Sequence, residues 1–335
     1  SPRCFSAAAA AEKHLGERPK QFTRYAEALA LREVDAVVIA TPDFAHSPIL
    51  RDAARAGKDA FVEKPMGTNT KDLAEALRAA EENKRVVAVG TQRRSEGRHQ
   101  AAVELIRSGV LGTISYAHSQ WNDHGPRWAR SYSDVRAEDV DWKQYLMGLP
   151  DRPFDPRRYR CWHLYRDYTV GVAGLLGAHG IDLACWYMND FLPQSAVAHG
   201  GIYVWKDGRE HADTMECLFE YSRGWLLNYS THLGNDRKEP ELVLHGTRGS
   251  FDTTSWTVSG EGGGAEKLKE TTVVPPRPNQ DHMRNFLECV RDRRPPNATI
   301  YDGFAHSLAS IMAQRSLETG HRQVYDPARM QIREG

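Results

Sequence analysis

The stretch VDAVVIATP at residues 34–42 decides the fold prediction. Residues 34–40 form a short, nearly continuous apolar run rich in β-branched side chains, which is typical of a strand buried in a parallel sheet. Similar runs follow at residues 59–63 and 86–90, and a helical pattern separates each run from the next. This repeated strand–helix–strand pattern predicts a doubly wound parallel sheet with right-handed crossovers.

The pattern changes near residue 114. A stretch rich in Trp, Arg, Tyr and Pro covers residues 122–168, and a glycine-spaced segment at 171–180 leads into a helix. Alternating apolar and polar runs then follow without intervening helices, which indicates an antiparallel sheet. The sequence therefore predicts an α/β parallel-sheet domain at residues 1–115 and an α+β domain with a large, mainly antiparallel sheet at residues 116–335.

The start of the parallel domain lacks features that a dinucleotide fold normally has. Such a fold opens with a strand, a Gly-rich turn and a helix, followed by a second strand that ends in an acidic residue. None of these precedes the helix expected at residues 7–15. Gly171, Gly174, Gly177 and Gly180 recur every three residues, but no strand precedes them. We therefore expect the first strand and the Gly-rich loop, roughly 30–40 residues, to lie upstream of this chain.

Composition excludes several classes of function. Lys plus Arg and Asp plus Glu each number 44, so the zero net charge gives no support to a nucleic-acid or anionic-membrane partner. No apolar run approaches the roughly 18 residues that span a bilayer. The five cysteines form no Cys-x-x-Cys pair, so neither a disulfide framework nor a metal site is predicted. Reduced thiols favour a cytoplasmic location, with an upstream export signal left open.

Polar residues follow two of the predicted strands, where α/β folds bind ligands. Thr41-Pro42-Asp43-Phe44-Ala45-His46 follows the first, and Glu63-Lys64-Pro65 follows the second. A buried lysine costs free energy unless it is paired or used, and Pro65 could hold the preceding peptide bond cis. On the residues alone, an ordinary turn and helix start explains the first segment equally well. A charged pair at the end of an apolar strand is unusual, so the second segment is a stronger signal, although a strand-to-helix turn remains its alternative.

These segments, taken with Gly90-Thr91-Gln92-Arg93-Arg94, Gly177-Ala178-His179-Gly180-Ile181-Asp182 and His245-Gly246-Thr247-Arg248-Gly249, resemble the Gfo/Idh/MocA oxidoreductase family. The resemblance covers nearly the whole chain. It implies a Rossmann-like domain that binds NAD or NADP, followed by a domain for a sugar or polyol substrate. In this family the sheet of the second domain often mediates homodimers or homotetramers.

The resemblance also implies roles for individual residues. Lys64 matches the family's active-site lysine and would handle the proton of the reacting hydroxyl, and His179 matches its histidine. The cofactor would lie along Thr41, Pro42, His46, Glu63, Lys64, Pro65, Gln92 and Arg93. The substrate would contact Trp121, Asp123, Trp162, Arg166, Asp167, His179 and Asp182, although packing explains the aromatic residues equally well and a structural hydrogen bond explains Asp182.

One position departs from the family pattern. Four residues before the histidine the family often has an aspartate, whereas this chain has Leu175, which can neither carry a proton nor accept a hydrogen bond through its side chain. We expect an NAD(P)-dependent dehydrogenase or reductase acting on CH–OH groups. Two alternatives stay open: a glycoside hydrolase that works by transient oxidation and elimination, and a non-catalytic sugar-binding regulator on the same fold.

Overall fold

A computed structural model describes residues 2–263 and 265–335 of the chain. The first part is a parallel sheet in the order β1-β2-β3, formed by Ala36–Ile39, Asp59–Val62 and Val87–Val89. Ala36 pairs with Asp59, and Ala60 pairs with Val87. The helices of this part are α1 (Pro2–Leu15), α2 (Tyr25–Leu29), α3 (Asp43–Arg55), α4 (Thr70–Glu82), the 3-10 turn η1 (Gln92–Ser95) and α5 (Gly97–Arg107).

Local sequence signals explain how the helices of the parallel part begin and end. The side chain of Asn69 caps α4 by accepting a hydrogen bond from the backbone N–H of Asp72 at 2.9 Å. Gly57 adopts φ +76°, a conformation that favours glycine, and turns the chain from α3 into β2. The β2 strand is buried along its whole length, as its apolar sequence predicts for a central parallel strand.

The second part is built on a large sheet with the order β12-β11-β10-β9-β4-β7-β6-β5-β13-β14, and β8 pairs with β4 beside this path. Among the described strands of this sheet only the pair β4–β7 is parallel, so the sheet is mainly antiparallel, as predicted. Its strands are β4 (Ile114–His124), β5 (Pro193–Gly201), β6 (Thr214–Tyr221), β7 (Trp225–His232), β8 (Gly234–Asn235), β9 (Val243–Gly246), β10 (Ser250–Asp252), β11 (Thr257–Ser259), β12 (Thr272–Val273), β13 (Gln323–Asp326) and β14 (Gln331–Glu334).

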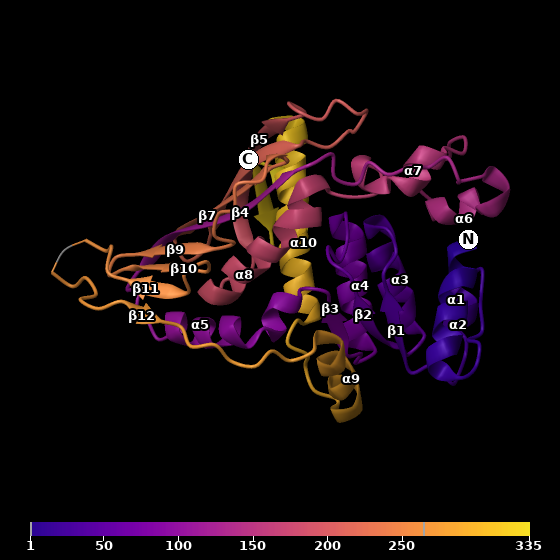
Figure 1. The fold of residues 1–335 in the computed structure, drawn as a ribbon, viewed down its shortest axis with the longest axis horizontal. Helices are drawn as coiled ribbons and strands as arrows, with labels where there is room; N and C mark the ends of the chain where they lie inside the picture. Colours follow the sequence, from indigo (N-terminus) through magenta and orange to yellow (C-terminus); the bar gives the residue numbers. More distant parts are fainter. Residues whose placement is uncertain (1, 264) are drawn as a thin grey trace.

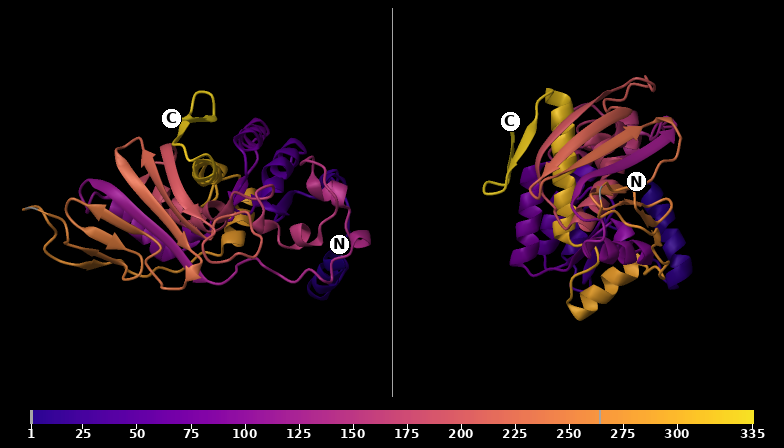
Figure 2. Two further views of the ribbon diagram at one scale, coloured as in Figure 1. Left: turned by 90° about the horizontal axis from the view of Figure 1, so that it is seen from above. Right: turned by 90° about the vertical axis from the view of Figure 1, so that its left-hand side faces the viewer.

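Helices cover one face of this sheet and join it to the parallel part (Figures 1 and 2). The helical segments are η2 (Ala137–Asp139), α6 (Trp142–Leu146), α7 (Pro156–Arg160), η3 (Trp162–Leu164), the π-helical turn η4 (Ala173–Gly177), α8 (Ala178–Met188), α9 (His282–Asp292) and α10 (Ile300–Thr319). Figure 1 shows α10 running between the large sheet and β3. The first residues of α10 form a capping box, in which Thr299 and Asp302 satisfy each other's backbone N–H groups.

The chain returns to the parallel part near its end. Phe286 of α9 packs against Phe61 of β2, with ring centroids 5.9 Å apart. His282 lies with Nε2 2.8 Å from the carbonyl oxygen of Val89 at the end of β3. No single position in the sequence therefore separates the two parts of the structure, because α9 lies late in the chain but packs on the early sheet.

Four of the described strands were not predicted, namely β8, β11, β13 and β14. The β13–β14 hairpin extends the sheet beyond β5, with Gln323 paired to Ala196. Its sequence mixes charged and apolar residues over short runs, so the alternation is too brief to distinguish it from a loop. Among the described residues, no helix is long and apolar enough to cross a membrane.

Candidate active site

A cavity of about 380 Å³ lies where the carboxyl ends of β1 and β2 meet η4 and α8. Parallel strands present their carboxyl ends at one edge of the sheet, which is where open α/β folds bind ligands. The second part of the molecule closes the cavity with aromatic side chains from β4 and the segments that follow it. Its polar lining comes from both parts of the molecule: Thr41, Asp43, His46, Glu63, Lys64, Arg127, His163 and His179.

Lys64 lies at the centre of this cavity. The peptide bond between Lys64 and Pro65 is cis, as the sequence suggested it could be. Lys64 Nζ donates a hydrogen bond of 2.6 Å to the backbone carbonyl of Leu175 in η4. Burial lowers the pKa of the Lys64 ammonium, while the negative charges of Asp43 and Glu63 raise it. A lysine with a lowered pKa is suited to exchanging a proton near neutral pH.

The loop after β1 is held by His46, which is 1% exposed. Its two ring nitrogens lie 2.7 Å and 2.8 Å from the carbonyl oxygens of Pro65 and Thr41. His46 therefore ties the loop after β1 to the loop after β2, and Pro42 precedes the first residue of α3. The hydroxyl oxygen of Thr41 is buried in the cavity and has no hydrogen-bond partner in the described chain.

His179 enters the cavity from the first turn of α8. Its ring stacks on Trp121 of β4, with centroids 6.0 Å apart. Burial is the main reason that its pKa falls to about 3, so the imidazole is neutral at physiological pH. Its Nδ1 atom is buried and finds no hydrogen-bond partner among the residues described. A neutral imidazole has one donor and one acceptor nitrogen, so His179 can bind a hydroxyl in either direction.

An aromatic wall completes the cavity. His163 lies between Trp162 and Trp128, with centroids 3.6 Å and 5.6 Å from its own, and both pairs are stacked. Burial lowers the pKa of His163 to about 3, and its Nδ1 lacks a partner in the part of the chain that the structure describes. Buried polar atoms in folded proteins are normally hydrogen-bonded. Thr41, His163 and His179 line one cavity, and each has a buried polar atom without a hydrogen-bond partner in the described chain. Such a group of atoms is expected where a ligand binds.

A second cavity of about 380 Å³ adjoins the first and shares Glu63, Lys64 and His179 with it. It is also lined by Val38, Gly90 and Gln92. Val38 is 58% exposed although it lies on a strand, and a Cβ atom on Gly90 would lie only 2.5 Å from Glu63 Oε2. An apolar strand surface beside a glycine that keeps the space open fits the flat ring of a nicotinamide. Glu63, Lys64 and Gln92 are the predicted cofactor residues that line this second cavity.

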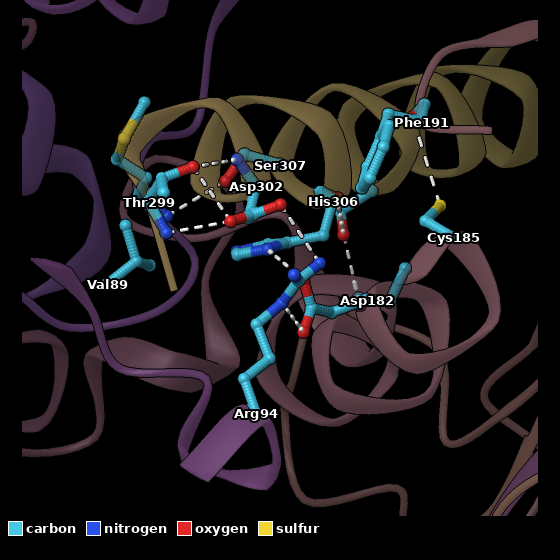
Figure 3. A network of polar contacts seen from close by, with 12 residues as sticks. Val89, Arg94, Asp182, Cys185, Phe191, Thr299, Asp302, His306 and Ser307 are labelled. Carbon is cyan, nitrogen blue, oxygen red and sulfur yellow. Dashed lines mark hydrogen bonds and ion pairs between the residues drawn. The ribbon is translucent and has the colours of Figure 1, made fainter. Parts of the chain in front are cut away.

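The structure does not bring every predicted substrate residue into the cavity. Asp182 is buried in an ion pair with Arg94, with Nε–Oδ2 at 2.8 Å, so its side chain is structural (Figure 3). Asp167 pairs with Arg152 at 2.7 Å. Arg166 donates from its backbone N–H to the Glu210 carboxylate and forms an ion pair with Glu318 through Nε at 3.4 Å. The structure therefore places these three side chains outside the lining of the cavity, each in an ion pair with an opposite charge.

Two other predicted residues, Arg93 and Asp123, do not line the cavity but form ion pairs near it. Arg93 lies outside both cavities, in ion pairs with Glu96 at 2.7 Å and Glu241 at 3.1 Å. Asp123 holds Arg127 by an ion pair, and Arg127 rather than Asp123 faces the cavity.

The sequence assigned no individual role to Asp43, Arg127 and Trp128, which do line the cavity, and it gave His163 only as part of a stretch resembling a substrate-lining segment. Asp43 stands between the assigned residues Pro42 and His46, so its position after a predicted strand was the available signal. Arg127 and Trp128 lie in an irregular segment, and no periodicity predicts where such side chains point.

No cluster of three or more metal-binding side chains occurs within residues 2–263 and 265–335.

The fold and the two adjoining cavities define a two-domain α/β protein with a ligand site at the carboxyl ends of its parallel strands. Residues 4–91 match the model of the NAD-binding Rossmann fold of the GFO/IDH/MocA oxidoreductase family, and residues 99–252 match the C-terminal domain of the same family. The chain therefore belongs to the Gfo/Idh/MocA family, and its first domain is the NAD-binding domain of that family. The resemblance read from the sequence motifs is confirmed.

Curated relatives of the chain include a dehydrogenase and a glycosyl hydrolase. Inositol 2-dehydrogenase of Rhizobium meliloti (strain 1021) is 28% identical over 126 residues, which cover 36% of this chain and 38% of that protein. Glycosyl hydrolase family 109 protein 1 of Shewanella sp. (strain ANA-3) is 22% identical over 350 aligned positions, covering 90% of this chain and 71% of that protein.

A solved structure shares the fold. Aldose-aldose oxidoreductase from Caulobacter crescentus, complexed with glycerol, superposes with a TM-score of 0.70 at 18% identity and covers 95% of this chain and 88% of that one. The chain aligns to only about a third of the length of the first curated relatives, from 34% to 38%.

Proposed function

We propose that the protein transfers a hydride between a nicotinamide cofactor and a hydroxyl-bearing carbon of a sugar or polyol. One observation carries this proposal: Lys64 and His179 line both adjoining cavities, one suited to the nicotinamide and the other walled by aromatic side chains. A group at such a junction can contact the reacting hydroxyl while the cofactor lies beside it. Aromatic faces beside polar groups are typical of sugar sites.

The bound nicotinamide would accept or donate the hydride at its ring. In the oxidative direction, Lys64 Nζ takes the proton that leaves the substrate hydroxyl, and its lowered pKa makes the neutral amine accessible. His179, neutral in the cavity, holds the same or a neighbouring hydroxyl by a hydrogen bond. The hydrogen bond from Lys64 to Leu175 fixes the direction of Nζ before substrate binds.

The central test is the substitution Lys64→Met in the chain with NAD and a panel of inositols and aldoses. NADH formation should fall by about two to four orders of magnitude, which is the usual contribution of a positioned acid–base group. NAD binding, measured by calorimetry, should change little. Lys58→Met is the matched control, because Lys58 is also a buried lysine of the same domain but donates to Leu31 far from the cavity. Full activity in Lys64→Met would refute the proposed role.

A second candidate is hydrolysis of glycosides by transient oxidation, elimination, water addition and reduction. The alignment with the family 109 glycosyl hydrolase over 90% of this chain supports this alternative. The two functions differ in redox balance, since the hydrolase restores its cofactor in each cycle. Release of free phenol from aryl glycosides without net NADH would favour hydrolysis, and net NADH from a free polyol would favour the dehydrogenase.

We also propose that the outer face of the large sheet forms a homodimer or homotetramer contact. Val197 pairs with Leu218 across β5 and β6, and Leu226 lies on the same face of β7. All three are more than a third exposed, whereas α8 and α10 cover the opposite face. Light scattering should show an oligomer, and Leu218→Glu should convert it to a monomer. A monomeric wild-type protein would exclude this contact.

A further inference from the structure

We propose that Asp43 is a positioning residue whose carboxylate is the charge partner of Lys64 and sets the pH at which Lys64 takes up and releases a proton. The inference rests on the role given to Lys64 in the proposed function. It assigns a task to a buried carboxylate that the sequence motifs left without one.

Asp43 is placed by two elements that meet at the cavity. It is the first residue of α3, where the partial positive charge of a helix N-terminus favours a carboxylate. Its side chain is 3% exposed, and Oδ2 accepts a hydrogen bond of 2.7 Å from the hydroxyl of Thr169. The backbone N–H of Phe44 donates to the carbonyl of Tyr168, so the same segment of the second domain holds the backbone beside it. The carboxylate is therefore fixed at the wall of the cavity.

Lys64 needs such a partner. Taking an ammonium group out of water is costly unless an opposite charge lies near it. In the described chain, the hydrogen bond of Nζ goes to the backbone carbonyl of Leu175, and the side chain of Leu175 carries no charge. Among the charged groups around Lys64, Asp43 raises its pKa more than Glu63 does, and Arg127 lowers it. Asp43 is thus the carboxylate with the larger effect on Lys64, and it acts across the cavity that both residues line.

The effect is reciprocal. Burial raises the pKa of Asp43 to about 7, and the Thr169 hydrogen bond and the charge of Lys64 hold it lower than burial alone would. Two groups that interact in this way titrate as a pair. The other titratable or charged groups facing the pair are Glu63 after β2, His46 on α3, Arg127 after β4, His163 on η3 and His179 on α8. The pKa values of the three histidines are all lowered by burial, so these imidazoles are neutral at pH 7, and the carboxylates of the lining are Asp43 and Glu63.

The proton balance of the reaction is then complete. In oxidation, a bound oxidised nicotinamide would take the hydride of the substrate C–H bond, while the neutral amine of Lys64 takes the proton of the O–H bond. The Asp43 carboxylate stabilises the ammonium that forms, and the ammonium afterwards releases its proton to solvent. In reduction, the same ammonium returns the proton to the oxygen.

The test measures the pKa of Lys64 directly, without substrate or cofactor. Competitive acetylation of the intact chain over a range of pH, followed by mass spectrometry of the Lys64 peptide, gives the fraction of neutral amine. Asp43→Asn keeps the shape and the acceptor for Thr169 but removes the charge, so the pKa of Lys64 should fall by about one unit or more. Asp59→Asn is the matched control, because Asp59 is a buried carboxylate at the opposite end of β2, paired with Arg293. It should leave the Lys64 pKa unchanged.

A second variant separates charge from packing. Leu175 lines the same cavity, so Leu175→Asp in the Asp43→Asn background places a carboxylate beside Nζ and should raise the Lys64 pKa again. A fall in Asp43→Asn that Leu175→Asp leaves in place would mean that Asp43 acts by packing, and it would overturn the inference. So would an unchanged Lys64 pKa in Asp43→Asn. Thr169→Val removes only the hydrogen bond to Asp43 and should lower the Lys64 pKa by a smaller amount. This milder variant provides the test if Asp43→Asn does not fold.

The outcome is independent of the proposed activity. If no sugar or polyol is oxidised but the Lys64 pKa follows Asp43, the proposed function fails and the charge pairing stands. If turnover is found, the acid limb of the kcat/KM profile in the oxidative direction should move to lower pH in Asp43→Asn, in parallel with the labelling. Turnover whose pH profile is the same in wild type and Asp43→Asn would overturn the pairing while leaving the function intact.

Discussion

Arg94 shows how a single side chain joins the two parts of the molecule. It leaves η1 after the parallel sheet and forms ion pairs with Asp182 of α8 and Asp302 of α10, at 2.8 Å and 3.0 Å (Figure 3). His306 of α10 lies with Nδ1 3.8 Å from the same Asp182. All four side chains are buried. The network connects one element of the first domain to two helices that carry the large sheet.

Arg94→Met should therefore be strongly destabilising. It leaves Asp182 and Asp302 buried without their cation, and removing one partner of a buried ion pair typically costs about 3–5 kcal/mol. Urea unfolding followed by circular dichroism measures the loss. Arg294→Met is the control, because Arg294 pairs with Glu288 at the surface and should cost less than about 1 kcal/mol. The double variant Arg94→Met/Asp182→Asn should lose less than Arg94→Met alone, and wild-type stability in Arg94→Met would contradict this account.

At the scale of an element, the close packing of η4 and α8 on the large sheet depends on glycine. A Cβ atom on Gly180 would lie 1.8 Å from the hydroxyl oxygen of Ser119 on β4. A Cβ atom on Gly177 would lie 2.8 Å from the ring of Tyr229 on β7. These contacts place the first turn of α8 against the sheet and so aim His179 at Trp121. The recurring glycines that do not bind pyrophosphate thus have a packing function.

Gly180→Ala tests this packing. The methyl group must displace Ser119, whose hydroxyl donates to the carbonyl of Glu241, so we expect a loss of about 1–3 kcal/mol in the free energy of unfolding. Gly125→Ala is the control, since a Cβ atom there meets nothing within 4 Å. Because His179 lies one residue away, the variant should also raise KM for substrate in an active protein. Equal stability of the two variants would rule out the proposed close contact.

Elements with a clear period or a buried apolar run were predictable from the sequence. The three parallel strands and the helices between them are observed where residues 34–42, 59–63 and 86–90 predicted them. Lys64 and His179 could also be placed, because motifs at a strand end and a helix start fix both the residue and its surroundings. Asp182, Arg166 and Asp167 could not, since opposite charges distant in sequence, such as Arg94, determine where a carboxylate or guanidinium points. The short strands β11, β13 and β14 form only because a neighbouring strand is present.

At the scale of the whole molecule, burial of ionisable groups predicts how stability depends on pH. Burial is the main cause that lowers the pKa of His99, His163 and His179 to about 3 and of His211 to about 4. The unfolded chain has histidines near 6.5, so below that pH it binds protons that the folded chain refuses. This part of the stability is fully present above about pH 6.5 and is lost as the pH falls. Asp43 acts in the opposite sense, because its folded pKa of about 7 exceeds the unfolded value of 3.8.

We therefore expect stability to fall steeply between pH 6.5 and pH 5. Each histidine contributes up to about 1.4 kcal/mol per pH unit well below its unfolded pKa, and Asp43 cancels about one of the four. The free energy of unfolding should thus decrease by roughly 3–4 kcal/mol per unit near the lower end of that range. Urea midpoints at pH 7.5, 6.0 and 5.0, at constant ionic strength, measure this slope. His99→Gln removes one of the four histidines and should reduce the slope by the contribution of one group, about 1.4 kcal/mol per pH unit. A stability that is constant or rises towards pH 5 would show that these imidazoles are protonated in the folded protein.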